Sequence, residues 1–196
     1  MSEKEKKIKK SDLLRTKIYN HAMELYSQKG FENVKVSDIC MASEISIGTF
    51  YYYFPSKEAV FLEYARCADT ILESYAAELK CSTQAEKIRL LLIKHVELFS
   101  MMGHELGNSC FSAFLKHKHT ASVDVKRSSY AHIKLYIDLA RESGEFKKDI
   151  DSSTAVSSLR YMIAGLCLRW ALSGEPLDVN KEAEFIAEQF ISIMKA

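Results

Sequence analysis

A run of hydroxyl-bearing and aromatic side chains occupies residues 46–54, which read SIGTFYYYF. Phenol and hydroxyl groups donate hydrogen bonds to phosphate oxygens, and aromatic edges pack against sugars and the methyl group of thymine. Gly48 has no side chain, so the backbone there can approach a ligand closely. Three adjacent phenols suit a protein core poorly, because each buried hydroxyl needs a partner. The stretch therefore predicts a surface that faces a polyanion; the alternative is a core helix whose tyrosine hydroxyls reach water.

Two short helices and a turn are expected to position this stretch. Ser37 is predicted to cap the first helix, in which Ile39 and Cys40 face inward, and residues 44–45 form the turn. Ser46 is predicted to cap the second. A helix-turn-helix of this kind fits the DNA major groove, where the second helix enters by its N-terminal end.

The second short helix is expected to end near Phe54, because Pro55 disfavours helical geometry in the residue before it. Phe50 and Phe54 are four residues apart and fall on one side of the helix, so they are assigned to the core. Ser56 is predicted to cap the helix that follows.

Helical periodicity dominates the remainder of the chain, and only two prolines and seven glycines interrupt its 196 residues. Ser11 and Asp12 predict the start of the first helix, and Gly30 its end. The sequence predicts an all-α fold of about nine helices with no strand. The later helices are expected at about 57–79, 84–101, 105–117, 121–143, 153–173 and 180–195, with linkers at 142–146 and 173–178.

The charge is unevenly distributed, although the formal net charge is only +1. Residues 1–17 carry seven lysines or arginines against three acidic residues, which predicts either a solvated tail or an arm that lies near phosphates.

The five cysteines include no CxxC pair, and no signal peptide precedes the first helix, so reduced thiols in a cytoplasmic protein are expected. No apolar run approaches the roughly 20 residues that span a bilayer.

Metal and catalytic chemistry find little support. His117 and His119 are two apart and do not share a helical face, and no paired set of Cys and His residues accompanies His95 or His104. We predict no metal site, no cofactor and no catalytic residue. The rival hypothesis of an enzyme that uses a Cys/His pair lacks a nucleophile motif.

Residues 36–61, VSDICMASEISIGTFYYYFPSKEAVF, resemble the DNA-binding signature of the TetR family of transcriptional regulators. The resemblance extends over about residues 13–65. Cys40 and Ser43 depart from the family pattern by replacing alanine, and Glu44 stands in the turn where glycine is usual. The matching positions are Ile39, Ile45, Ser46, Gly48, Thr49, Tyr51, Phe54, Lys57 and Glu58, with Gly30 and Phe31 upstream.

The resemblance implies a DNA-binding domain at 1–56 and an effector-binding and dimerisation domain at 57–196. It implies a homodimeric repressor that a small molecule of unknown identity releases from a palindromic operator; the alternatives are an activator or a helical interaction module without a DNA role. Ser37, Ser46, Tyr51 and Lys57 would contact phosphates, Ile47, Gly48, Thr49 and Tyr52 would meet base edges, and Tyr53 would do either.

The last two helices are apolar on more than one side, and such helices need more than one partner. We expect them to pair with their symmetry mates in a four-helix dimer interface. The predicted interface residues are Leu159, Ile163, Leu166, Ile186, Phe190 and Ile193.

Methionine and aromatic side chains of the middle helices suit an adaptable effector pocket, although such residues more often belong to a core. The predicted pocket residues are Phe99, Met102, Phe111, Phe114, Tyr130, Met162 and Trp170.

Overall fold

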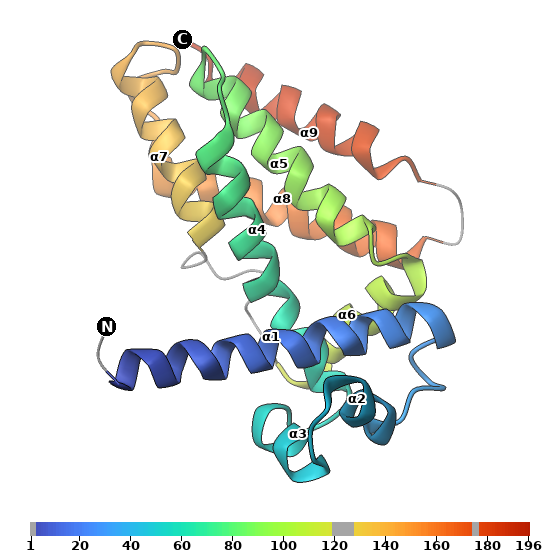
Figure 1. Ribbon diagram of the computed structural model, residues 1–196. Coiled ribbons are helices and arrows are strands. Elements are labelled where there is room, and N and C mark those ends of the chain that lie inside the picture. Colours follow the sequence, from blue (N-terminus) through green and yellow to red (C-terminus); the bar gives the residue numbers. More distant parts are fainter. Residues whose placement is uncertain (1–2, 119–127, 174–176) are drawn as a thin grey trace. The chain divides into compact units, whose positions relative to one another are not determined.

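The computed structural model describes residues 3–118, 128–173 and 177–196, and these ranges are helical apart from loops and one isolated bridge between Phe146 and Lys195 (Figure 1). The all-α expectation is confirmed. The elements of the described chain are α1 (Glu3–Lys29), α2 (Val36–Ser43), α3 (Ile47–Tyr53), the 3₁₀ helix η1 (Glu58–Glu63), α4 (Tyr64–Glu78), α5 (Gln84–Ser100), α6 (His104–Lys116), α7 (Ser128–Glu142), α8 (Ser152–Leu172) and α9 (Val179–Met194).

The chain forms two compact units. The first comprises the described parts of residues 1–67 and 105–119, and the second those of residues 68–104 and 120–196. Most of α6 therefore belongs to the same unit as α1, α2 and α3, although it follows them by some 50 residues of chain. The functional division at residues 56 and 57 stays a prediction.

Helix α1 begins at Glu3, so the predicted start at Ser11 and Asp12 was wrong. The upstream segment consists mainly of glutamate and lysine, which are good helix formers, and the segment continues the helix. The predicted end is confirmed, because Gly30 has φ +79° and its N–H donates to the carbonyl of Tyr26 at 2.9 Å.

Aromatic rings fill much of the core of the first unit. Tyr26, Phe31 and Phe61 pack with ring centroids 5.1–5.4 Å apart, and Phe50 lies 5.9 Å from Phe54. All five side chains are buried. Burial also raises the pKa of Tyr26, whose hydroxyl donates to the carbonyl of Lys57 at 3.0 Å. This core includes Phe50 and Phe54 of the α3 region and so anchors that helix.

The chain between 57 and 79 differs from the single helix that the sequence predicted. It starts as η1 and becomes α-helical at Tyr64, where α4 begins. Lys57 occupies the capping position of η1 where Ser56 was predicted, although the Ser56 hydroxyl accepts from the N–H of Ala59 at 3.2 Å. In the same unit, Lys116 of α6 pairs with Glu58 of η1 at 3.3 Å.

In the second unit α5 packs against α7, α8 and α9, and α8 packs against α7 and α9 (Figure 1). Thr83, Asp151 and Asp178 cap α5, α8 and α9 by accepting from backbone N–H groups.

Residues 121–127 of the helix expected at 121–143, and residues 174–176 of the expected linker, lie outside the described residues. The linker at 142–146 is confirmed by the turn at Gly144, where φ is +78°.

Candidate nucleic-acid interface

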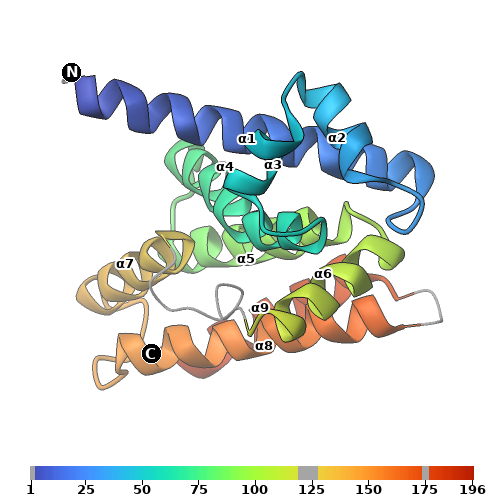
Figure 2. The ribbon, with the colours of Figure 1, turned by 90° about the horizontal axis from the view of Figure 1, so that it is seen from below.

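Helix α3 starts at a capped N-terminus, as the sequence predicted. The Ser46 hydroxyl accepts from the N–H of Thr49 at 3.0 Å and also lies 2.9 Å from the Thr49 hydroxyl. Phe54 closes the helix in extended backbone (φ −135°, ψ 115°), as expected for a residue that precedes proline. Figure 1 shows α2 and α3 on one side of α1, and Figure 2 looks onto them from below.

The two faces of α3 differ sharply in exposure. Phe50 and Phe54 are fully buried, as predicted, whereas Tyr52 is 80% exposed, Ile47 55% and Tyr51 52%. Gly48 is exposed as well. Large apolar and phenolic groups that lie open to water on a short, well-anchored helix are typical of a binding surface rather than of a core.

Tyr53 is partly buried and held in place. Its hydroxyl accepts a hydrogen bond from the Ser11 hydroxyl of α1 at 3.3 Å, and its ring meets that of Tyr52 edge to face at 5.1 Å. Because the phenol oxygen accepts from Ser11, its own O–H can donate outward. A phosphate oxygen is one acceptor for which this geometry is suited.

Helix α2 begins two residues earlier than predicted, so the assignment of Ser37 as its cap was wrong. Lys35 occupies the capping position, and its N–H donates to the Asp38 carboxylate at 2.9 Å. Ser37 lies exposed in the first turn of α2, where its hydroxyl remains available to a ligand. Ile39 and Cys40 are buried as predicted.

The turn between α2 and α3 contains Glu44 in the left-handed conformation (φ 57°, ψ 45°). A residue other than glycine is strained in this conformation, by roughly 1 kcal/mol. The Glu44 carboxylate accepts from the Lys17 ammonium of α1 at 3.1 Å. The negative charge beside the start of α3 is therefore paired, and Lys17 is drawn toward it.

Lys57 is bound within the first unit, and the phosphate contact that the resemblance implied for it stays a prediction. Its ammonium donates to the carbonyls of Phe31 and Val34 at 2.7 and 2.9 Å and lies 4.1 Å from the centre of the Phe31 ring. Two of its three N–H groups thus hold the loop between α1 and α2, and one is left for a phosphate.

The predicted effector residues are divided between the two units. In the second unit the Trp170 ring packs against Phe99 at 5.6 Å and stacks on His104 at 4.2 Å, and Tyr130 stacks on His95 at 5.7 Å. Met102 is partly buried and Met162 exposed in that unit. Phe111 and Phe114 lie in the first unit, 6.1 Å apart on α6.

Most of the predicted dimer residues pack inside the second unit. Leu159, Ile163, Leu166 and Phe190 are buried, Ile186 is partly buried, and only Ile193 is largely exposed. The same two helices also carry exposed apolar side chains, namely Tyr161, Met162, Leu168 and Leu172 of α8 and Phe185 and Ile193 of α9.

Other chemistry finds no support among the described residues. They contain no group of three His, Cys, Asp or Glu residues that could hold a metal ion, and none of their helices is long and apolar enough to cross a membrane. The five cysteines are free. Burial, together with the nearby Glu63 carboxylate, raises the pKa of Cys67 to about 11, which makes this thiol a poor nucleophile at neutral pH.

Comparison with known proteins points to one family. Residues 18–64 match the family described as bacterial regulatory proteins, tetR family. The chain is 28% identical to the transcriptional regulator QacR of Staphylococcus aureus, over 64% of this chain and 65% of QacR. It is 25% identical to the regulator UidR of Escherichia coli K12, over 87% of this chain and 86% of UidR. Among solved structures, Thermus thermophilus FadR, a TetR-family repressor in complex with lauroyl-CoA, superposes with a TM-score of 0.67 at 23% identity, over 93% of this chain and 95% of FadR.

Proposed function

Because the chain belongs to the TetR family of transcriptional regulators, we propose that it works as a homodimeric repressor whose binding to operator DNA is ended by a small-molecule effector. The observation that carries the proposal is the outward face of α3, where Ile47, Tyr51 and Tyr52 lie open above the buried Phe50 and Phe54. A pair of such helices related by a twofold axis fits two successive major grooves of a palindromic site.

The interface residues divide into two groups. Ser37, Ser46, Tyr51 and the third N–H of Lys57 would donate to phosphate oxygens, and they set the position of the protein on the duplex. Ile47, Gly48, Thr49 and Tyr52 would face the base edges, with Tyr53 serving either group. The reading helix contains no arginine, asparagine or glutamine. Specificity would therefore depend on contacts with thymine methyl groups and on DNA shape rather than on bidentate hydrogen bonds.

The exposed apolar face of α8 and α9 supports a dimer. Tyr161, Gly165, Leu168 and Leu172 recur at spacings of four, three and four, which places them on one face of α8. Phe185 and Ile193 are exposed on α9, which packs against α8, and they would extend this face. We propose that this face, with Ile186 at its edge, meets the same face of a second copy. Leu159, Ile163, Leu166 and Phe190 would support the face from beneath.

The effector would bind in the second unit, beside the aromatic side chains of Phe99, Tyr130 and Trp170. FadR of Thermus thermophilus binds lauroyl-CoA, and an apolar or aromatic effector would likewise suit these residues. Effector and DNA would oppose each other, because each favours a different conformation of the dimer. We expect the protein in the cytoplasm, where the chromosome is, and we assign it no catalytic role.

The test is to select duplexes from a random-sequence library with the wild-type protein and to compare them with a shuffled duplex of equal length. Tyr52→Ala is expected to weaken binding to the selected duplex by about 5- to 150-fold, since a base contact is worth about 1–3 kcal/mol, and to change binding to the shuffled duplex by less than about twofold. Tyr52→Phe separates the hydroxyl from the ring. An equal loss on both duplexes would reject a reading role for Tyr52.

A further inference from the structure

A buried carboxylate lies between two arginines in the first unit. Glu63, at the end of η1, is only 3% exposed. One of its oxygens accepts from Nε of Arg15 on α1, and the other accepts from Nε of Arg66 on α4. Arg66 also donates to the hydroxyl of Thr16. Such a carboxylate is tolerable in the interior only because guanidinium groups compensate it.

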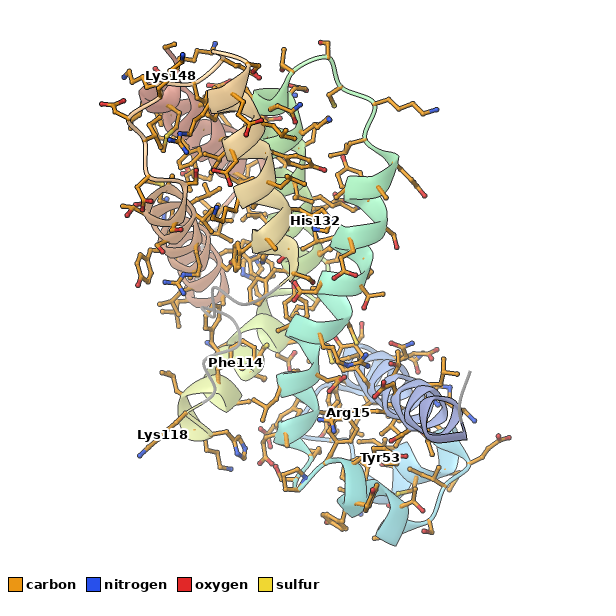
Figure 3. All side chains as sticks on the ribbon, turned by 90° about the vertical axis from the view of Figure 1, so that its left-hand side faces the viewer. Arg15, Tyr53, Phe114, Lys118, His132 and Lys148 are labelled. Atoms are coloured by element: carbon orange, nitrogen blue, oxygen red, sulfur yellow. The ribbon has the colours of Figure 1, made fainter. Side chains whose placement is uncertain are left out.

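Arg15 makes a second contact that connects this cluster to the reading helix. Its Cζ atom lies 4.8 Å from the centre of the Phe54 ring, and Phe54 is the fully buried residue that closes α3. One turn earlier on α1, the Ser11 hydroxyl donates to Tyr53. Figure 3 labels Arg15 and Tyr53 in this region. The C-terminal end of α3 is thus held against α1 by two neighbouring contacts.

We propose that Arg15 is a positioning residue that sets the orientation of α3 for reading DNA. Glu63 holds the guanidinium by accepting a hydrogen bond from its Nε, and the guanidinium lies over the Phe54 ring. Arginine is suited to both tasks at once, because it is planar, always charged and less strongly hydrated than an ammonium. Lysine can pair with Glu63 but cannot cover the ring in the same way. The inference rests on the proposed DNA-reading function of α3.

Arg66 supplies a matched control. The side chains of Arg15 and Arg66 are 37% and 43% exposed, and each donates through Nε to the same carboxylate. The contacts of Arg66 described above run to η1 and α1, whereas Arg15 touches the end of α3. Arg15→Met and Arg66→Met each leave Glu63 with one guanidinium. Their stability losses should therefore be similar, while their effects on DNA reading should differ.

The experiment measures the ratio of affinities for the selected and the shuffled duplex, at temperatures where denaturation curves show each variant folded. Arg15→Met is expected to lower this ratio about tenfold, and Arg66→Met to leave it within about twofold of wild type. Arg15→Lys should also lower the ratio while keeping the pairing with Glu63. If Arg15→Met does not fold, Arg15→Lys alone decides whether Arg15 positions α3. Equal losses in the two methionine variants, or no loss with Arg15→Met or Arg15→Lys, would overturn the proposal.

Amide hydrogen exchange of the free protein gives a readout that does not depend on DNA. The N–H of Phe54 donates to the carbonyl of Phe50 at 2.9 Å, and its exchange reports how firmly α3 is closed. Arg15→Met should speed this exchange several-fold more than Arg66→Met does. Equal exchange in the two variants would refute the positioning role. A wild-type protein that selects no duplex at all would instead refute the proposed function, and the exchange result would still decide the role of Arg15.

Discussion

The pairing of Glu44 with Lys17 leads to a prediction about DNA affinity. Glu44 places a carboxylate two residues before the capping residue of α3, and Lys17 neutralises it at 3.1 Å. Replacing Glu44 by glutamine keeps the backbone and removes the charge. We expect the Glu44→Gln protein to bind duplex DNA more tightly, because a negative charge near the groove disappears and Lys17 becomes free to contact a phosphate.

The magnitude follows from the exposure of the pair. The Glu44 side chain is 83% exposed, so an ion pair there stabilises the fold by no more than about 1 kcal/mol. A charge some 8 Å from a phosphate contributes roughly 0.5 kcal/mol in water, and a new lysine–phosphate contact adds a similar amount. Together they correspond to a gain of about 5-fold in affinity, with a salt dependence steeper by about 0.9 in the logarithmic slope.

Glu44→Gly separates charge from backbone strain. Glycine relieves the cost of the left-handed conformation but gives the unfolded chain more freedom, so the free energy of unfolding should stay within about 1 kcal/mol of wild type. Lys17→Met is the matched control: it leaves Glu44 unpaired and should weaken DNA binding.

The assay is fluorescence anisotropy of a labelled duplex over a series of salt concentrations, with urea unfolding in parallel. An unchanged affinity and salt slope in Glu44→Gln would show that the pair does not lie near the DNA.

Three further predictions concern the same unit. Lys57→Met should lower the free energy of unfolding by about 1–3 kcal/mol, because two carbonyls lose a charged donor; a urea curve that matches wild type would contradict this. Removal of residues 1–10 should flatten the salt dependence of DNA binding, because the basic start of α1 is lost, and an unchanged slope would show that this segment does not lie near phosphates. The Ser56 hydroxyl, the backbone N–H of Glu58 and then Lys116 hold the pKa of Glu58 at about 2, below its ordinary value near 4.5. This stabilisation is present above pH 4.5 and is lost as the pH falls toward 2. Glu58→Gln should therefore be less stable than wild type at pH 7, by about 1 kcal/mol after allowance for solvent screening, and equal to it near pH 2 in urea unfolding.

Local patterns in the sequence were enough to predict the reading helix. The signals are a serine cap at 46, phenylalanines at 50 and 54 and the proline that follows. Each lies within about one helical turn of the next, and each acts on the backbone or side chains close to it. The start of α1 was missed because a cap-like Ser11–Asp12 pair stands inside a run of strong helix formers. Propensity summed over the run outweighed the local signal.

Contacts between residues distant in sequence were beyond prediction. Lys17 and Glu44 are 27 residues apart, and Lys57 reaches carbonyls 26 and 23 residues upstream. In sequence each of these lysines is only a positive charge, and the fold decides whether it meets a carboxylate, a carbonyl or a phosphate. The dimer residues show a similar limit. Periodicity showed that α8 and α9 carry apolar residues on more than one side. It did not show which of these sides packs inside the unit and which is exposed to solvent.

Footprinting of the wild-type protein on its selected duplex tests the central claim most directly, namely that two copies of the exposed α3 face enter successive major grooves. We predict two protected half-sites of inverted sequence, with centres about one helical turn (10–10.5 base pairs) or a multiple of it apart. Protection of both half-sites should be strong with the wild-type protein and weaker with the Tyr52→Ala variant. A single unsymmetrical footprint, or a footprint that Tyr52→Ala leaves unchanged, would contradict the account.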